Sequence, residues 1–264
     1  MKRVFNFLLM ITVLYSTSLA YSKDEGHSTL GEVAEWSIIT SAFAGGFIMD
    51  HTPIWTSKPL IGGTTNSPYH ENTIPSSWLY AGVGVFSTGI ALLPNNSGWI
   101  NRTSYINTKG IIKAVSFTYF VTAITKNIVG RKRPSYDNFP VDDEIDSKKS
   151  FFSGHSAISF SIATYSSLYV FEHIGNINDP LNLASKILFT TGMASIASYV
   201  AYSRVEDNMH FVSDVLVGGM VGTAMSSIVY AYQNKWLDKR HNPIQHVNVT
   251  FCNGIGSLSI SAVF

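Results

Sequence analysis

The stretch IIKAVSFTYFVTAITKNIVGRKRP, residues 111–134, contains the pattern that decides the fold. Its first part, 111–129, is a long and mostly apolar run that exceeds the length of a typical strand and suits a helix. Pro134 then prevents a regular helix from continuing. Comparable apolar segments follow one another along the chain at 34–49, 78–94, 155–174, 185–203 and 211–233. We therefore predict an all-α protein, built as a bundle of five to six long apolar helices.

The two ends of the chain carry different signals. Lys2 and Arg3 precede an apolar run, and small residues end at Ala20, which is typical of a signal peptide over 1–20. The alternative is an uncleaved first transmembrane helix. The signal predicts an exported protein of the cell envelope.

The C-terminal residues alternate between apolar and polar side chains around Asn253 and Gly254, which favours a hairpin. We predict a helical domain over residues 21–245, followed by a short β-hairpin over 246–264.

The composition limits the function classes. Hydrophobic residues make up 45% of the chain and charged residues 13%, whereas soluble domains carry about 25% charged residues. The chain therefore has a large buried core or lies partly in lipid, and both alternatives stay open. The formal net charge of +1 excludes a broad basic face for nucleic acid. The single Cys252 excludes a disulfide framework and a multi-cysteine zinc site.

The first of three polar clusters closes the apolar run 111–129. Lys126 comes near the end of this predicted helix, and Arg131, Lys132 and Arg133 follow it. Basic residues at a helix C-terminus also suit the helix dipole. Alone, this cluster indicates no more than a solvated helix end.

The second cluster, Ser153, Gly154 and His155, opens the apolar segment 155–174. Ser153 suits the N-cap position, and the free N–H groups of a first helical turn form a ready anion site. Gly154 allows an anion to approach the backbone closely. His155 adds a titratable group at the same place. An ordinary serine cap beside an incidental histidine is the alternative.

The third cluster consists of Ser203, Arg204, His210 and Asp214. His210 and Asp214 are four residues apart and share one face of a helix. A carboxylate there can accept the Nδ1 proton of the imidazole and leave Nε2 as a nucleophile. Arg204 offers a guanidinium fork for phosphate. An i, i+4 ion pair on a polar face is the alternative.

Together the three clusters resemble the phosphatidic acid phosphatase type 2 (PAP2) and vanadium haloperoxidase superfamily, phosphatase branch. That family has the ordered pattern K-x6-RP, PSGH and SR-x5-H-x3-D, which the chain matches between residues 126 and 214. One departure is Phe152, which replaces the proline of the second motif. Because that proline shapes the turn without taking part in chemistry, the departure concerns local geometry only.

The resemblance implies a phosphatase that needs neither metal nor cofactor and that hydrolyses phosphate monoesters or diphosphates through a phosphohistidine. It assigns the nucleophile to His210, its orientation to Asp214, and proton transfer to and from the leaving oxygen and water to His155. It assigns phosphate binding to Lys126, Arg133, Ser153, Gly154 and Arg204.

The three motifs do not identify the substrate, which has to be inferred from composition and export. An apolar helical body and export favour phosphorylated lipids and membrane association. A soluble periplasmic nonspecific acid phosphatase, a vanadate-dependent haloperoxidase and an inactive phosphate-binding envelope protein are the alternatives. The acidic residues Asp142, Asp143, Glu144 and Asp146 are interpreted as a solvated loop, with a role in gating the basic site as the alternative. Gly218 and Gly222 are expected to allow close helix packing.

Overall fold

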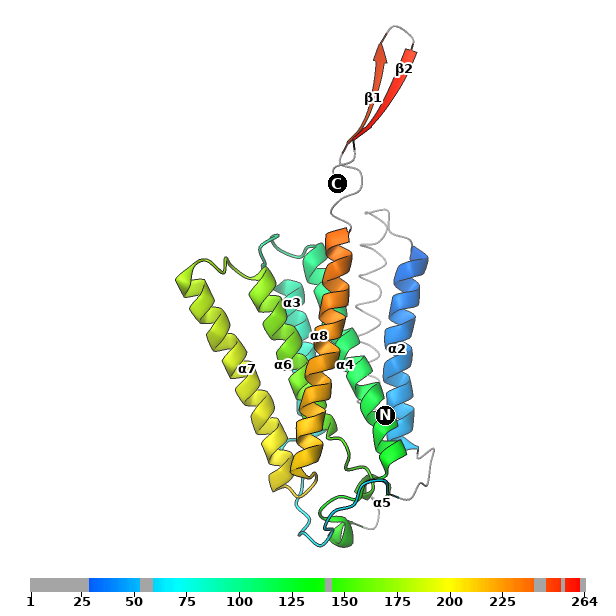
Figure 1. Cartoon of the computed structure of the whole chain (residues 1–264), viewed down its shortest axis with the longest axis vertical. Helices are drawn as coiled ribbons and strands as arrows, with labels where there is room; N and C mark the ends of the chain where they lie inside the picture. The colour runs from blue at the N-terminus through cyan, green and yellow to red at the C-terminus, as the bar shows by residue number, and fades with distance from the viewer. Residues whose placement is uncertain (1–28, 53–58, 141–143, 240–245, 253–254, 262–264) are drawn as a thin grey trace.

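The computed structural model describes residues 29–52, 59–140, 144–239, 246–252 and 255–261. The predicted signal peptide, 1–20, lies outside these residues. The body is helical, as predicted, and its helices run roughly along one direction (Figure 1). The long helices are α2 (Thr29–His51), α3 (Ser76–Leu92), α4 (Arg102–Val129), α6 (Gly154–His173), α7 (Pro180–Glu206) and α8 (Val212–Lys239).

Helices α2, α4 and α7 begin before the apolar segments that predicted them, and side chains cap the starts of α4 and α7. The Asn101 side chain accepts a hydrogen bond from the Ser104 amide at 3.1 Å and so caps α4. Asp179 caps α7 in the same way, through the Leu181 amide at 2.8 Å, and Pro180 follows it at the first helical position. A search for apolar runs omits polar first turns such as these, although their caps are themselves helix-start signals.

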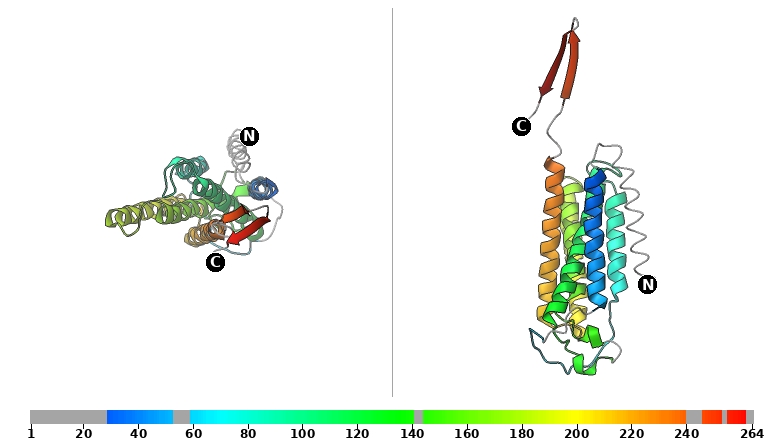
Figure 2. Two further views of the ribbon diagram at one scale, coloured as in Figure 1. Left: turned by 90° about the horizontal axis from the view of Figure 1, so that it is seen from above. Right: turned by 90° about the vertical axis from the view of Figure 1, so that its right-hand side faces the viewer.

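Helix α4 lies at the centre of the bundle. It packs against α2, α3, α6 and α8, while α2 and α7 lie on opposite sides of it (Figures 1 and 2). Its residues Ile111, Ile112 and Ala114 are fully buried, and the core continues into α6 around Tyr165. Central burial of α4 fixes the direction in which its last turn presents Lys126.

Helices α6 and α8 are in close contact, as the two glycines predicted. A Cβ atom at Gly218 would lie 2.6 Å from the Ser153 carbonyl oxygen, and one at Gly222 would overlap the Ala157 carbonyl oxygen. Only hydrogen at these positions allows the two backbones to touch. The contact continues where the Ser156 hydroxyl donates to the Val215 carbonyl at 2.6 Å. It thereby sets the N-terminus of α6 against that of α8.

Two strands follow the helical body, β1 (His246–Cys252) and β2 (Ile255–Ser261), paired antiparallel with Val249 opposite Leu258. The Asn253-Gly254 pair, on which the predicted hairpin depends, lies outside the described residues. The hairpin turn and the boundary at residue 246 therefore stay predictions.

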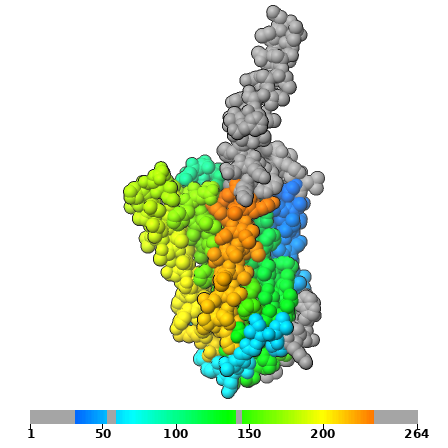
Figure 3. All heavy atoms as spheres, in the orientation of Figure 1, coloured from blue at the N-terminus to red at the C-terminus, as the bar shows by residue number. Residues whose placement is uncertain are grey.

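The outer face of α7 and α8 is rich in exposed apolar side chains. These two helices are adjacent outer elements of the body (Figure 3). Leu188 and Ile196 of α7 and Met220 and Ile228 of α8 are all more than half exposed. Within the described residues, Val212–Asn234 is long and apolar enough to cross a membrane by length and composition.

Candidate active site

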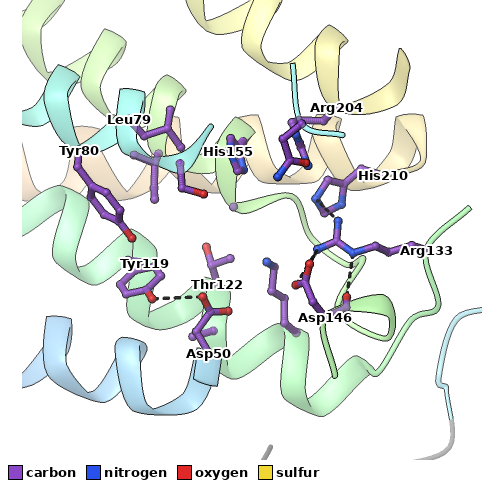
Figure 4. Close-up of a pocket in the computed structure, with 16 residues that line it drawn as sticks. Asp50, Leu79, Tyr80, Tyr119, Thr122, Arg133, Asp146, His155, Arg204 and His210 are labelled. Atoms are coloured by element: carbon purple, nitrogen blue, oxygen red, sulfur yellow. Dashed lines mark hydrogen bonds and ion pairs between the residues drawn. The ribbon is translucent and has the colours of Figure 1, made fainter. Parts of the chain in front are cut away.

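A pocket lies at the end of the bundle where α4 ends, α6 begins, α7 ends and α8 begins (Figures 1 and 4). Six of the eight predicted site residues line it: Lys126, Arg133, Gly154, His155, Arg204 and His210. The other two, Ser153 and Asp214, are fully buried behind its wall. The structure thus brings together residues that are up to 84 positions apart in the sequence.

The chain turns sharply between Lys126 and Arg133. Gly130 adopts a left-handed conformation with φ of 59°, and its amide donates to the Lys126 carbonyl at 3.0 Å. Glycine is favoured there because a Cβ atom is strained in this region. The turn carries the chain back under the helix, so that Arg133 lines the same pocket as Lys126.

Arg133 uses all its donors within the protein. Its Nη2 donates to both carboxylate oxygens of Asp146 at 2.8 Å, and its Nε donates to the Asp146 carbonyl at 2.8 Å. Its Nη1 donates to the Met209 carbonyl at 3.0 Å and lies 3.4 Å from His210 Nε2. An arginine has five N–H donors. An anion that binds Arg133 must therefore replace one of these partners.

Asp146 differs from the prediction of a solvated acidic loop. It belongs to the short helix α5 (Glu144–Ser147) and lines the pocket beside Arg133. Burial alone would raise the pKa of the Asp146 carboxyl, but the charges of Arg133 and Lys126 outweigh burial and hold it below its usual range. A carboxylate thus lies on the guanidinium to which a phosphate was predicted to bind.

The start of α6 forms the second wall. The Ser153 side chain accepts a hydrogen bond from the Ser156 amide at 3.4 Å, which confirms the predicted N-cap. A Cβ atom at Gly154 would lie 3.8 Å from the Lys126 ammonium nitrogen, so the first turn of α6 faces this cation with no side chain between them. The arrangement suits an anion held by both backbone and cation.

His210 is oriented differently from the prediction. Its Nδ1 lies 2.7 Å from the Ser150 carbonyl oxygen, to which it can only donate, whereas Asp214 Oδ2 is 3.8 Å from the same nitrogen. The backbone carbonyl therefore takes the place that the sequence assigned to the carboxylate. The consequence for the tautomer is the same: the proton sits on Nδ1, and Nε2 keeps its lone pair.

Asp214 acts on the surroundings of His210. It accepts from the Ser150 hydroxyl, from the Phe211 amide at 3.1 Å and from Arg131, which forms a buried ion pair with it. The Arg131 guanidinium also lies 3.9 Å from the centre of the Phe211 ring. These contacts hold Ser150 in place, and the Ser150 carbonyl in turn holds the His210 imidazole. Asp214 therefore positions His210 indirectly.

Arg204 connects the pocket to the loop before α3. It lies 3.3 Å from Asp207 and donates to the Asn72 side chain at 2.7 Å. Asp207 also accepts from the Thr73 amide at 2.9 Å and from its hydroxyl at 2.6 Å. Burial and neighbouring Arg133 lower the pKa of Arg204 to about 10, so the guanidinium stays charged at neutral pH.

The surroundings of both histidines favour the neutral imidazole. Burial, followed by the charges of Arg133 and Arg204, lowers the pKa of His210 well below its usual range. Burial, followed by the charge of Arg204 and by His210, does the same for His155. An anion placed between them would oppose the cationic contribution and raise both pKa values.

Sequence reasoning missed the residues that line the far end of the pocket. These are Asp50 from α2, Leu79 and Tyr80 from α3, and Tyr119 from α4, and Figure 4 shows them across the pocket from Arg204, His210 and Arg133. They carry no motif, and each is separated from the three clusters by at least one helical turn. Asn72 was missed as well, because the loop 52–77 offered no signal beyond its turn residues.

Comparison with known proteins identifies a domain within the chain. The sequence profile of the PAP2 superfamily matches residues 110–238, a range that includes the pocket's basic residues and both histidines. The chain contains a PAP2 superfamily domain. The matched PAP2 range begins inside α4 and ends inside α8, so α2 and α3, which supply the far end of the pocket, precede it.

Several curated proteins with PAP2-type names are similar to the chain. Phospholipid phosphatase homolog 1.2 homolog of Caenorhabditis elegans is 30% identical over 36% of this chain and 34% of its own length. Lipid phosphate phosphatase 1 of Arabidopsis thaliana is 26% identical over 71% of this chain and 64% of its own length. Phospholipid phosphatase 1 of Mus musculus is 27% identical over 73% and 80% respectively. The chain thus spans about a third of the first relative and just under two thirds of the second.

Among solved structures, the chain is similar to a transmembrane PAP2-type phosphatidylglycerolphosphate phosphatase from Bacillus subtilis. The TM-score is 0.47 at 19% identity, over 89% of this chain and 98% of that one.

Proposed function

We propose that the chain is a phosphatase that hydrolyses phosphorylated lipids, as monoesters or diphosphates, through a phosphohistidine on His210. One observation carries the proposal. The Nδ1 of His210 is held at 2.7 Å from a backbone carbonyl, so the lone pair is on Nε2. This nitrogen lies 3.4 Å from Arg133 Nη1 in a pocket that Lys126 and Arg204 also line. A fixed, neutral nucleophile facing several cations suits attack on a phosphoryl group.

In the first step, Nε2 attacks phosphorus, and the bond between phosphorus and the leaving oxygen breaks as the phosphorus–nitrogen bond forms. His155 donates its proton to the leaving oxygen, which departs as an alcohol or a phosphate. In the second step, His155 takes a proton from water, whose oxygen attacks phosphorus and breaks the phosphorus–nitrogen bond. Phosphate leaves with the proton that His155 took from water, and both histidines return to their neutral form.

The cations and the start of α6 stabilise the transition state. Lys126, Arg133, Arg204 and the Gly154 amide surround the non-bridging oxygens, on which charge is concentrated during transfer. For Arg133 to take part, the phosphate displaces the Asp146 carboxylate. Ser153 supports this wall as the cap of α6. It is fully buried and does not line the pocket, so we assign it this supporting role in place of the predicted direct contact with phosphate.

The proton on His155 comes with the substrate. Burial and the nearby positive charge lower the pKa of this imidazole and favour its neutral form. A bound phosphoester brings negative charge beside it, which favours the imidazolium form. A phosphoester that enters as a monoanion can itself supply the proton. General acid catalysis by His155 therefore depends on the substrate being bound.

A lipid substrate is supported by two features. Two relatives that overlap about seven tenths of this chain are named lipid phosphate phosphatase 1 and phospholipid phosphatase 1. The outer face of α7 and α8 exposes large apolar side chains, and such patches mark contact with a membrane or partner. We place the protein at a membrane of the cell envelope, with Asp214 as a positioning residue for His210.

Trapping the intermediate tests the mechanism. Wild-type protein is mixed with a ³²P-labelled lipid phosphate and quenched in alkali, in which phosphohistidine survives and acyl phosphate does not. Label should remain on the wild-type chain, disappear in acid, and be absent from His210→Gln. Turnover by wild type with no trapped label, or retained turnover in His210→Gln, would overturn the proposal.

A further inference from the structure

The pocket has a second polar end that the proposed reaction does not use. Asp50, at the last turn of α2, lies there with Tyr80 of α3 and Tyr119 of α4, and these three side chains point toward one another (Figure 4). The cations Arg133 and Arg204 lie at the opposite end. If phosphate binds to the cations, the remainder of the substrate extends toward this end.

Hydrogen bonds to two backbone carbonyl oxygens hold the end of α2, which carries Asp50, in place. The Asn127 side chain donates to the Met49 carbonyl at 2.7 Å, and the Lys149 ammonium donates to the Asp50 carbonyl at 2.5 Å. These are the free carbonyls at the end of α2, which need such partners. Close approach of α2 to α4 depends on Gly46, where a Cβ atom would lie 2.9 Å from the Tyr119 ring.

The carboxylate has unused capacity as an acceptor. The Tyr119 hydroxyl donates to Asp50 Oδ2 at 3.3 Å, and Tyr80 in turn hydrogen-bonds Tyr119. Within the described residues, no cation lies within ion-pair distance of the Asp50 side chain. A carboxylate offers about four lone-pair sites, so most of those on Asp50 face the pocket without a protein donor.

The surrounding wall is apolar. Leu79, Ala123 and Ile158 also line the pocket. The far end therefore combines aliphatic contact with one anionic acceptor. A group that fills it well has carbon for the walls and an O–H or N–H for the carboxylate. An ester oxygen or a carbonyl placed there would face another acceptor, with no hydrogen to share.

We propose that Asp50, supported by Tyr119, forms a leaving-group subsite that binds a free hydroxyl or ammonium group of the substrate. The inference rests on the proposed phosphatase function and narrows its substrate class. Phosphoesters whose leaving alcohol carries a free donor are preferred. Phosphoesters whose neighbouring oxygens are all esterified, and plain alkyl phosphates, are hydrolysed less efficiently.

Three matched substrates test the subsite: 1-O-octyl-glycerol 3-phosphate, its 2-deoxy analogue and its 2-amino-2-deoxy analogue. They differ at one position, which offers a hydroxyl, no donor or an ammonium. Wild type should show kcat/KM about tenfold or more higher for the hydroxyl or the ammonium substrate than for the deoxy one, because hydrogen bonds to charged groups contribute at this level. The comparison of the two donors identifies which source of the donor is preferred.

Asp50→Asn removes the charge and keeps an oxygen for Tyr119. It should bring the ratio of donor to deoxy substrate close to one, because kcat/KM should fall far more for the two donor substrates than for the deoxy substrate. Asp137→Asn is the matched control, because its carboxylate accepts from Thr65 at 2.6 Å on an exposed loop, and it should keep the wild-type ratio.

The outcomes separate the subsite from the reaction. Wild type that hydrolyses none of the three substrates contradicts the proposed function itself. Wild type that hydrolyses all three equally overturns the subsite alone. An Asp50→Asn variant that loses activity equally on all three also overturns it, since this pattern shows that Asp50 only supports the helices.

Discussion

Helix α4 carries the buried cations Lys109 and Lys113 near its start and the half-buried Lys126 near its end, and their charges are compensated in different ways. Near its start, the Lys109 ammonium lies 2.9 Å from Glu32 and 2.6 Å from Glu35, and Lys113 lies 2.6 Å from Glu35. Near its end, no carboxylate among the described residues lies within ion-pair distance of Lys126.

The carboxylates that pair with these two sets of cations belong to different kinds of element. Glu32 and Glu35 belong to the long helix α2, and their side chains are 16% and 23% exposed. Asp146, the partner of Arg133, belongs to the four-residue helix α5, and its side chain is 51% exposed. A carboxylate fixed on a packed helix neutralises a cation permanently, whereas one on a short surface turn can be displaced by another anion. The first set supports the fold, and the second is available for binding.

Replacing Lys109 should produce the largest change. Lys109→Met leaves the Glu32 carboxylate buried without its main partner, and breaking a buried pair in this way destabilises by about 3–5 kcal/mol. Denaturant titration measures the loss in the free energy of unfolding. The folded fraction should retain wild-type kcat, because Lys109 is remote from the pocket. Loss of kcat without loss of stability would show that the α2 cluster takes part in function.

Lys126→Met is the matched substitution at the other end of the same helix. It removes one cation from the phosphoryl group, and the loss of a single stabilising group lowers kcat/KM by about 10²–10³-fold. The free energy of unfolding should change little, since no carboxylate is left unpaired among the described residues. A large loss of stability with normal kcat/KM would remove the distinction between the two sets of cations.

Asp146→Asn should change anion binding in the opposite direction. Because the carboxylate competes with phosphate for Arg133, its neutralisation should lower the inhibition constants of inorganic phosphate and vanadate by about tenfold. Glu206→Gln is the control, because Glu206 is exposed near the site but does not line the pocket. Weaker anion binding in Asp146→Asn would show that Asp146 orients Arg133 for the substrate.

The pH dependence should be the smallest effect. The pKa of His210 is lowered by burial and by Arg133, so its Nε2 stays unprotonated below the ordinary histidine pKa of about 6.5. The acid limb of kcat/KM should therefore lie below pH 6.5. Above that pH the stability from burying neutral imidazole is fully present, and it is lost as the pH falls toward the lowered pKa.

His210→Gln serves as the comparison for the pH dependence of stability. His210→Gln removes one of the groups that the unfolded chain protonates first, so its unfolding free energy should fall less steeply between pH 6.5 and pH 5 than that of wild type. An acid limb above pH 6.5, or an equal slope in the two proteins, would contradict the neutral state of His210.

Much of this architecture could be read from the sequence. Long apolar runs predicted the helical body because they exceed the length of typical strands. Ser153 predicted the N-cap of α6. Three short motifs identified six residues that line one pocket, because each motif keeps its own spacing. Gly218 and Gly222 predicted close packing for a steric reason that needs no partner to be known.

Other contacts could not be read in this way because they depend on tertiary placement. Asp146 has no local sequence feature that distinguishes it from the other acids of its loop. Its pairing with Arg133 depends on the turn at Gly130. Ser150 offers His210 a backbone carbonyl, and every residue has a carbonyl, so no residue type marks it. Asp50 belongs to a helix that no motif touches. Local patterns reveal chemistry within a segment, while these contacts arise only between segments.

The backbone contact between α6 and α8 divides the pocket into a constant and an adjustable half. The Ser153 amide donates to the Asp214 carbonyl at 3.0 Å, so the turn that faces the phosphate and the segment that carries the imidazole are tied together as one unit. No side chain separates them, which leaves little room for substitutions on that side. Altered preference for the leaving group is therefore most readily obtained through α2, α3 and the loop before α3, where side chains alone form the wall and can be exchanged without moving the reacting atoms.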